Sequence, residues 1–399
     1  RSVSSDQVFL FLGLALVLRL LWFPAIPALS DDFYRFIWDG KLLAHGVSPF
    51  MATPLQLLQS GNLQRYNLTI DLYQNLNSPH YFTIYPPLNQ FVFWLAAEIS
   101  PDSWRGSVTV MRFFILRAEA GTLILLPRLL IMNQLPSRHS ILYAYNPLVI
   151  AELTGNLHFE AMMIFFLLLA IYFWQRQKVF TGGVMMGFAV AAKLLPLMLL
   201  PLWLGRLRWK KLFLFYLATG ATCVLLFSYL LDYDFLLGMQ SSVGLYFTKF
   251  EFNGSLYFLI REIGYLIKGY NIIQTAGKYL ALIVVFFIVF MSWFQHYRRL
   301  SIWHSIRWAW LFYLLMATIV HPWYVTPLVV LSVFTRFRFG IVWSFLIFFT
   351  YVNYQAAGYD ENLWIVTLEY LLLLIFIIFE FTWQKKNQPI VTETGNTAK

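Results

Sequence analysis

The chain has 399 residues, of which 59% are hydrophobic, 19% aromatic and only 12% charged. Because soluble domains carry about 25% charged residues, this composition excludes a soluble enzyme, a nucleic-acid-binding module and a disulfide scaffold, and it indicates an all-α polytopic membrane protein. We attribute the net charge of +10 to basic loops on the cytoplasmic face and expect no nucleic-acid partner.

Apolar runs long enough to cross a bilayer recur from one end of the sequence to the other. They cover residues 8–29, 84–98, 108–133, 141–153, 161–174, 180–204, 212–231, 272–294, 306–320, 323–334, 341–354 and 363–381. The runs at 108–133 and 180–204 are long and have a charged residue near the middle, Glu119 and Lys193 respectively. We therefore predict that each forms two short antiparallel helices meeting near the outer face. The total is then about 12–14 transmembrane helices, with both termini cytoplasmic.

This topology leaves two long segments outside the membrane, residues 30–85 and 232–271. No internal repeat or linker divides the rest. Residues 1–386 are therefore predicted to form a single transmembrane domain, followed by a polar cytoplasmic tail at residues 387–399. The outer segments carry most of the loop carboxylates, so we expect the chemistry of the chain at the outer face.

The segment after the first apolar run is the most informative. Asp31 and Asp32 suit the first turn of a helix, and spacings of three and four place Asp32, Arg35 and Asp39 on one face. We predict an amphipathic helix that lies on the outer membrane surface and stops at Gly46. Adjacent carboxylates at such a boundary suit a general base, because a partly desolvated carboxylate can have a raised pKa. The alternative is a helix cap with a solvated acidic first turn.

A motif in this segment and shorter marks in later segments carry a family resemblance. The motif reads Asp31-Asp32-x-Tyr34-Arg35-x-x-Trp38-Asp39-Gly40, followed by Gly46-x-x-Pro49-Phe50. The later marks are Tyr85-Pro86-Pro87-Leu88, Asn146-Pro147-Leu148, His158-x-Glu160, Lys193-x-x-Pro196 and His321-Pro322-Trp323-Tyr324. Together they resemble the GT-C superfamily of integral-membrane glycosyltransferases, in particular its polyprenyl-phosphate-mannose-dependent mannosyltransferase-like group.

The resemblance implies a GT-C-like helical bundle and an inverting glycosyltransferase. Such an enzyme moves a sugar, here expected to be mannose, from a polyprenyl or dolichyl monophosphate to a hydroxyl of a glycan, lipid or protein acceptor. The family's first-loop base corresponds to Asp31 or Asp32, and we favour Asp31 because Arg35 can occupy Asp32. The active site is expected on the periplasmic or lumenal side of a bacterial inner membrane or a eukaryotic ER membrane, in contact with membrane lipids.

Other residues on the same predicted side are candidates for binding the donor phosphate or another part of the substrate. A departing lipid phosphate gains negative charge, which preorganised cations and hydrogen-bond donors stabilise. The candidates are Arg35, Asp39, His158, Glu160, Lys193, Arg261, His321, Trp323 and Tyr324. For Lys193 the alternative is an ion pair with Glu119 or Glu152 inside the membrane.

The pair His158 and Glu160 suits either a divalent cation or local hydrogen bonds. One histidine with one or two carboxylates falls short of a zinc site, which takes about three or four protein ligands. We therefore assign no metal ligands and no certain cofactor, and a divalent cation stays open as an alternative.

Two other functions compete with the enzyme. A secondary transporter places ionisable residues near the membrane midplane, usually within repeated halves. Pairing of Lys193 with Glu119 would fit a transporter, although no repeat is visible. A noncatalytic subunit of a glycosyltransferase complex would keep the fold without its activity, and the retained acidic pair argues against it.

Overall fold

The structure, a computed structural model, describes residues 5–231, 233–353 and 361–386. Within these residues the fold is helical and contains no strand, only one isolated bridge between Phe252 and Ile319. The predicted all-α class is confirmed. The tail predicted at residues 387–399 lies outside the described residues.

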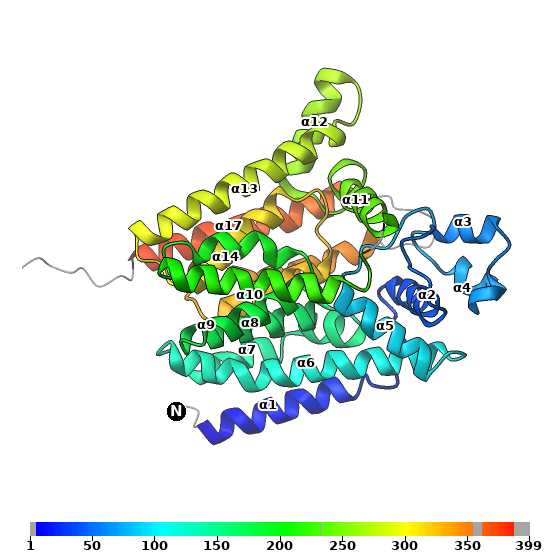
Figure 1. Cartoon of the computed structure of the whole chain (residues 1–399). Coiled ribbons are helices and arrows are strands. Elements are labelled where there is room, and N and C mark those ends of the chain that lie inside the picture. The colour runs from blue at the N-terminus through cyan, green and yellow to red at the C-terminus, as the bar shows by residue number, and fades with distance from the viewer. Residues whose placement is uncertain (1–4, 232, 354–360, 387–399) are drawn as a thin grey trace, which may run out of the picture.

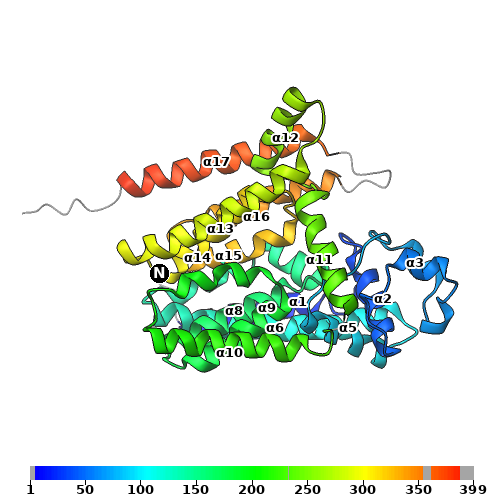
Figure 2. The ribbon, with the colours of Figure 1, turned by 45° about the horizontal axis from the view of Figure 1, so that its top comes forward.

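The described residues form a series of helices, which Figures 1 and 2 show from two directions. Here η marks 3-10 segments, except η3, which is a π-helix. The first part contains α1 (Ser5–Leu20), α2 (Asp32–Ala44), α3 (Pro54–Gln59), η1 (Gln64–Tyr66), α4 (Ile70–Gln74), α5 (Pro87–Ile99), α6 (Trp104–Met132), η2 (Ser137–His139), α7 (Ser140–Ala144), η3 (Val149–Gly155), α8 (Glu160–Gln175) and α9 (Val179–Ala192). The second part contains η4 (Leu195–Trp203), α10 (Trp209–Phe227), α11 (Tyr233–Thr248), α12 (Ser255–Lys268), α13 (Ile273–Tyr297), α14 (Ile302–Met316), η5 (Pro322–Val325), α15 (Thr326–Val333), α16 (Phe339–Leu346), η6 (Ile347–Asn353) and α17 (Leu363–Lys386).

The bundle has two polar ends. Both views place α2 and α3 at one end, which we call the loop end (Figures 1 and 2). At the opposite end α1 begins, α17 ends, and basic turns connect the helices; we call this the basic end. Its arginines include Arg176, Arg206, Arg208, Arg298 and Arg299. The second predicted outer segment is largely helical, because it contains α11 and α12.

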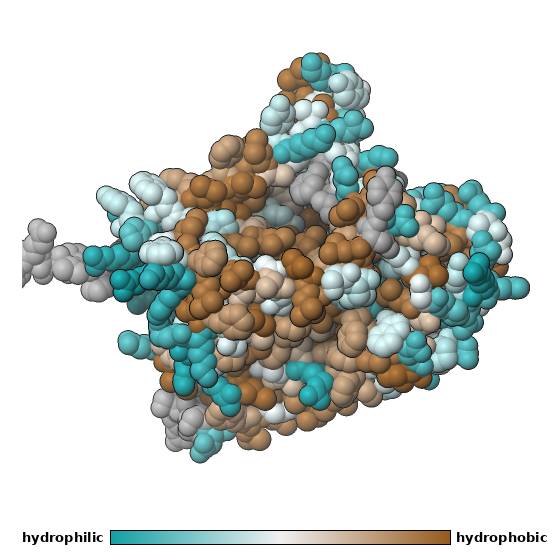
Figure 3. Space-filling model, in the orientation of Figure 1, coloured by the Kyte–Doolittle hydropathy of each residue, from teal (hydrophilic) through white to brown (hydrophobic). Residues whose placement is uncertain are grey.

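Several elements are apolar enough for a bilayer. Among the described residues, α10, α13 and α17 have both the length and the hydropathy to span one. A fourth span is formed if η3 and α8, which meet at a bend of 108°, count as one. Shorter apolar segments lie at Val179–Ala192, Pro322–Val333 and Phe339–Asn353. Figure 3 shows a broad hydrophobic belt between two hydrophilic ends, so the chain is a helical polytopic membrane protein.

The hairpin predicted within residues 108–133 is wrong, because α6 is one unbroken helix. The carboxylate of Glu119, which suggested a bend, has its hydrogen-bond partners inside the bundle. Arg19 Nε donates to Glu119 Oε2 at 2.8 Å, and both side chains are fully buried. The Tyr143 hydroxyl also donates to Glu119. A carboxylate that finds its partners on neighbouring elements needs no turn at the membrane surface.

The break predicted within residues 180–204 is confirmed. α9 ends at Ala192, and Lys193 has an extended backbone with φ −156° and ψ 137°. The segment η4 then begins, with Pro196 near its start. Proline fits the first turn of a helical segment, where its missing N–H has no partner to lose. Lys193 therefore lies at an interruption between two apolar segments rather than on the side of a helix.

Candidate active site

Helix α2 brings the acidic motif to the loop end, and its boundaries agree with the predicted helix. Ser30 Oγ accepts a hydrogen bond from the Asp32 N–H at 3.3 Å, which supports the first turn. The helix ends at Ala44, and Gly46 adopts φ +71° just beyond it. Glycine takes a positive φ without steric cost, so the chain turns away at this point.

The structure differs from the prediction of a surface helix, because α2 does not present a polar face to water. Nine of its 13 residues are buried, three of them charged. One face packs so closely on α5 that a Cβ added to Gly40 would lie 2.2 Å from the Phe93 carbonyl oxygen. The first outer segment covers another part, where Lys41 Nζ donates to the Asn67 carbonyl oxygen at 2.7 Å. Protein therefore fixes the position of α2 and of its first turn.

Arg35 and Asp39, two of the candidate substrate-binding residues, form a buried ion pair. Arg35 Nε donates to Asp39 Oδ1 at 2.8 Å, and its Nη1 donates to the Tyr81 carbonyl oxygen at 2.9 Å. Gln90 Nε2 donates to Asp39 Oδ2 at 2.9 Å. The expectation that Arg35 occupies Asp32 is therefore wrong, because the buried carboxylate one turn further on is its partner. The pair ties α2 to the outer segment and to α5.

The two adjacent aspartates have different surroundings. Asp31 is exposed, whereas Asp32 is partly buried, and Asp32 Oδ1 accepts a hydrogen bond from Asn77 Nδ2 at 2.9 Å. Burial raises the pKa of Asp32 above its ordinary value, although the Asn77 hydrogen bond and the positive charge of Lys193 counteract this shift. The reason for favouring Asp31 no longer holds, and Asp32 is the aspartate that faces other ionisable groups.

Three interruptions of apolar segments bring side chains toward Asp32. The bend between η3 and α8 carries His158 and Glu160, the break after α9 carries Lys193, and the turn before η5 carries His321. Asp32 interacts electrostatically with both Lys193 and Glu160. Non-helical backbone inside a membrane protein occurs where protein or a cavity surrounds it, so such breaks gather polar groups. We call these five residues the Asp32–Lys193 cluster.

Within the cluster, Lys193 is bound by a carboxylate and an aromatic ring. Its Nζ forms an ion pair with Glu160 and lies 4.7 Å from the centre of the Tyr324 ring. The predicted alternative partners, Glu119 and Glu152, are wrong. Glu119 is engaged elsewhere in the bundle, and the bend before α8 places Glu160 at the lysine.

Trp323 holds the two histidines of the cluster. Its ring stacks on His158 with centroids 3.7 Å apart and on His321 with centroids 4.5 Å apart. His158 Nε2 also lies 3.1 Å from Glu152 Oε2, within ion-pair distance, although the two groups are not aligned for a hydrogen bond. Trp323 is buried, so its contacts with the histidines place it as a residue that positions them.

The cluster has an accessible part and a hidden part. The side chain of Lys193 is 20% exposed, and Asp32 and His321 are also partly exposed. The side chains of Glu160 and His158 are only 3% exposed. Solvent therefore reaches the aspartate and the lysine, while a buried carboxylate and a buried histidine support them from within the protein.

Sequence reasoning missed three contributors to this site. Asn77 and Tyr85 both form hydrogen bonds with Asp32, and the Tyr351 hydroxyl donates to Glu152. Tyr85 opens one of the motif marks and could have been found from it. Asn77 and Tyr351 lie in segments without a pattern, so only the three-dimensional arrangement reveals them.

Arg261, a further candidate, belongs to a different set of ion pairs. Its Nη1 lies 2.9 Å from Glu251 Oε1, and its Nη2 lies 3.0 Å from Glu262 Oε1. The guanidinium also stacks over the Phe258 ring at 4.4 Å. Arg261 is carried by α12, whereas α2 and the three breaks build the cluster.

Metal binding was the alternative for His158 and Glu160. Over the residues that the structure describes, no group of three or more His, Cys, Asp or Glu side chains is placed to hold a metal ion. In the structure, these two side chains contact Glu152 and Lys193 respectively.

The arrangement places the Asp32 carboxylate within electrostatic reach of a fixed cation, Lys193. A partly buried carboxylate with a raised pKa accepts a proton from a hydroxyl more readily than an ordinary one does. A lysine held by a buried carboxylate can stabilise negative charge that grows during a reaction, because its position is set beforehand. Both groups are reachable by solvent, as a site of group transfer requires.

Comparison with known families adds a finding about the first half of the chain. Residues 14–207 match the family model described as alpha-(1->6)-mannopyranosyltransferase, N-terminal domain. This segment is just under half of the chain, and it contains α2 and the breaks that carry His158 and Lys193. No individual curated protein matches the chain.

Proposed function

We propose that the chain is a mannosyltransferase whose donor is a polyprenyl or dolichyl monophosphate carrying mannose. The match of residues 14–207 to the family model described as alpha-(1->6)-mannopyranosyltransferase, N-terminal domain, supports this proposal. The acceptor is a hydroxyl group of a glycan, a lipid or a protein. One observation carries the proposal: Asp32, which is partly buried, lies within electrostatic reach of Lys193 at a break between apolar segments. A lipid-linked substrate would bring its phosphate to that boundary.

In this proposal Asp32 is the general base. The acceptor hydroxyl gives its proton to the Asp32 carboxylate while its oxygen attacks the anomeric carbon of mannose from the face opposite the phosphate. The bond between that carbon and the phosphate oxygen breaks, and the electron pair leaves with the lipid phosphate. The anomeric configuration is thereby inverted. The products are the mannosylated acceptor, the lipid phosphate and protonated Asp32.

Lys193 stabilises the leaving phosphate. A lysine inside the membrane region costs about 2.5–3.5 kcal/mol on insertion scales, so it is retained where it has a partner or a task. Glu160 holds the ammonium group of Lys193 in place. The side chain of Lys193 is 20% exposed, so a ligand can reach it. His321 is partly exposed beside it and can donate a further hydrogen bond. Preorganised donors of this kind lower the barrier most where charge develops.

Buried neighbours position these groups rather than reacting themselves. The Arg35–Asp39 pair and the close contact at Gly40 hold α2, which sets where Asp32 lies. Trp323 fixes the rings of both histidines, and Tyr324 packs against the Lys193 ammonium group.

We also propose which way the chain faces. The loop end, which carries the Asp32–Lys193 cluster, would face the periplasm or the ER lumen, and the basic end would face the cytoplasm with both termini. The support is the gathering of arginines at the basic end, since cytoplasmic loops carry an excess of Lys and Arg. The protein would function within a bacterial inner membrane or a eukaryotic ER membrane.

The proposed donor can be tested with purified protein in detergent. Radiolabelled mannose is supplied either as a polyprenyl monophosphate or as a nucleotide sugar, together with an extracted acceptor, and the anomeric configuration of the product is determined. We expect transfer from the lipid donor only, with inversion. Transfer from the nucleotide sugar alone, or retention of configuration, would overturn the proposal. Uptake of a solute into proteoliposomes without any transfer would favour the transporter instead.

A further inference from the structure

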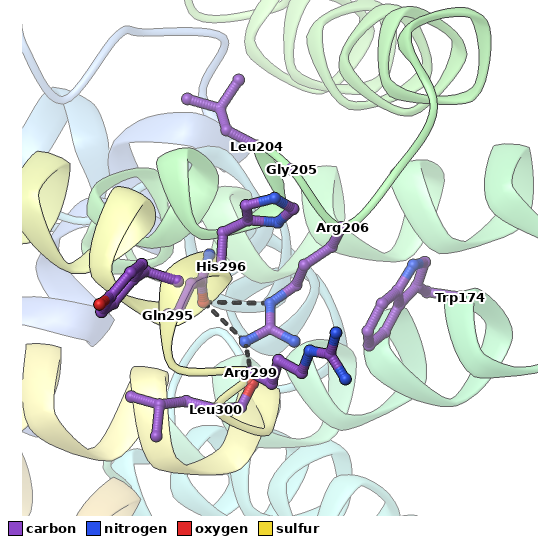
Figure 4. Close-up of a pocket in the computed structure, with 9 residues that line it drawn as sticks. Trp174, Leu204, Gly205, Arg206, Gln295, His296, Arg299 and Leu300 are labelled. Atoms are coloured by element: carbon purple, nitrogen blue, oxygen red, sulfur yellow. Dashed lines mark hydrogen bonds between the residues drawn. The ribbon is translucent and has the colours of Figure 1, made fainter.

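A second polar site lies at the basic end of the bundle, separate from the Asp32–Lys193 cluster. A cavity of about 620 Å³ opens there between the end of α8, the turn after η4 and the end of α13. Arg206, Gln295, His296 and Arg299 are among its lining residues. Figure 4 shows the Arg206 and Arg299 side chains reaching the same space from two different elements, with His296 beside them. The volume falls within the range of about 300–1,000 Å³ that is usual for ligand sites.

Arg206 is held in place by neutral partners. Its Nε and Nη2 donate to Gln295 Oε1 at 3.0 and 2.7 Å, and Nη2 also donates to the Leu300 carbonyl oxygen at 2.8 Å. Gln295 is buried and is itself fixed by donating to the Leu202 carbonyl oxygen at 2.7 Å. These partners orient the guanidinium without neutralising its charge. Burial lowers the pKa of Arg206 to about 10, which still leaves it protonated at neutral pH.

Arg299 enters the cavity from a strained backbone position. It follows the last turn of α13 with φ +51°, a left-handed conformation that is uncommon for a residue with a long side chain. Across the described part of the chain, no carboxylate lies within ion-pair distance of Arg206 or Arg299. Two positive charges thus line one cavity, and the described protein supplies no opposite charge within ion-pair distance.

The surroundings place this cavity at the depth of lipid headgroups. Tyr297, which lines the cavity, is 71% exposed, and Trp209, three residues after Arg206 in the chain, is 73% exposed. Such rings gather at the membrane–water interface. Further basic residues follow or precede the lining segments in the chain: Arg176, Arg208, Lys210, Lys211 and Arg298. A negatively charged membrane surface attracts a basic cluster of this kind.

We propose that this cavity binds the phosphate headgroup of an anionic membrane lipid. Arg299 would donate to phosphate oxygens through its planar guanidinium fork, which matches phosphate geometry. Arg206 would donate through Nη1, because its Nε and Nη2 are bound to protein partners, and His296 would add one hydrogen bond. The lipid chains would run along the adjoining apolar surface. A soluble phosphate compound offers the same recognition chemistry, whereas the ammonium group of a zwitterionic lipid would meet two arginines. This site does not depend on the proposed transfer reaction.

Native mass spectrometry of the delipidated full-length protein tests the site. The protein is titrated with phosphatidylglycerol, with phosphatidylcholine and with inorganic phosphate. We expect one tightly retained phosphatidylglycerol, weaker retention of phosphatidylcholine, and no displacement of the lipid by millimolar phosphate. Arg299→Gln should weaken phosphatidylglycerol binding about tenfold, which corresponds to about 1.4 kcal/mol, and Arg206→Gln/Arg299→Gln should weaken it further.

The matched control is Arg208→Gln/Arg298→Gln, which removes the same charge from exposed neighbours that do not line the cavity. It should retain the lipid within about twofold of the native chain, so that a loss in both double variants would point to the overall charge and overturn the site. Arg299→Gln with unchanged affinity would also overturn it, and this variant tests the site even where Arg206→Gln prevents folding. Displacement of the lipid by inorganic phosphate at equal concentration would overturn the assignment to a lipid.

Discussion

Two ion pairs at the loop end of the bundle have opposite surroundings. Arg35–Asp39 is closed to solvent, and backbone and side-chain groups of the outer segment and α5 occupy both partners. In Lys193–Glu160 the carboxylate is buried, but the lysine is 20% exposed and faces Asp32. The first pair can only hold the fold, whereas the second retains a charge that a ligand can use. Exposure of the cation to solvent, rather than the presence of an ion pair, distinguishes the two sites.

The largest effect is expected when the buried Arg35–Asp39 pair is broken. Arg35→Met leaves Asp39 as a buried carboxylate without its cation, and breaking a buried ion pair in this way costs about 3–5 kcal/mol. The melting temperature in detergent should fall by several degrees, and activity should fall because α2 loses its position. Arg105→Met, at an exposed arginine of α6, is the control and should leave both quantities unchanged. An unchanged melting temperature for Arg35→Met would show that the pair does not hold α2.

We expect a substitution in the Lys193–Glu160 pair to lower the reaction rate more than the melting temperature. Lys193→Gln removes the proposed phosphate partner, and loss of one preorganised charge costs about 100- to 1,000-fold in kcat. Its effect on melting temperature should be smaller than that of Arg35→Met, because the Lys193 side chain is 20% exposed and solvent reaches the position of its ammonium group. Lys268→Gln, at an exposed lysine on α12, is the matched control. A kcat for Lys193→Gln equal to that of the control would remove Lys193 from the mechanism.

A smaller effect tests how firmly α2 is seated. Gly40→Ala places a methyl group against the Phe93 carbonyl oxygen, and overpacking of this kind costs about 1–3 kcal/mol. Melting temperature and activity should both decrease, because α2 must move away from α5. Gly13→Ala in α1, where a Cβ meets no atom within 4 Å, should be neutral or stabilising. If both alanine variants behave alike, the close contact at Gly40 is not what positions the motif.

The smallest effect is a dependence on pH. The raised pKa of Asp32 means that the folded state holds its proton more tightly than the unfolded state, so protonated Asp32 favours folding. This contribution is present at low pH and is lost as pH rises through the folded pKa. Asp32→Asn should therefore melt at a slightly higher temperature than the native chain above that pKa and at the same temperature below about pH 3.9. A lower melting temperature for Asp32→Asn at neutral pH would contradict the raised pKa.

Much of the loop end could be predicted from the sequence. The capping residues, the spacing of apolar positions and Gly46 define α2, and the proline after Lys193 indicates the break at that residue. These signals are local, because they depend on residues within one or two helical turns. The partner of Arg35 was not predictable in the same way, since Asp32 and Asp39 lie three and four residues away and both are within reach.

The remaining errors concern contacts between distant segments. Glu119 suggested a bend because its partner Arg19 lies 100 residues earlier, where no sequence pattern connects the two. The alternative for Lys193, an ion pair with Glu119 or Glu152, is wrong about the partner. The bend that presents Glu160 to Lys193 follows a π-helix, which hydrophobic periodicity does not reveal. Asn77 approaches Asp32 only because the outer segment folds back over α2.

We propose that Asp32, and not its neighbour Asp31, is the base. Asp32→Asn and Asp31→Asn change the same atom in adjacent residues, so each is the control for the other. Mannosyl transfer from the lipid donor should fall about 100- to 10,000-fold in Asp32→Asn, the range for loss of a general base, and stay within about threefold of the native rate in Asp31→Asn. Equal rates in the two variants, or the larger loss in Asp31→Asn, would contradict the assignment.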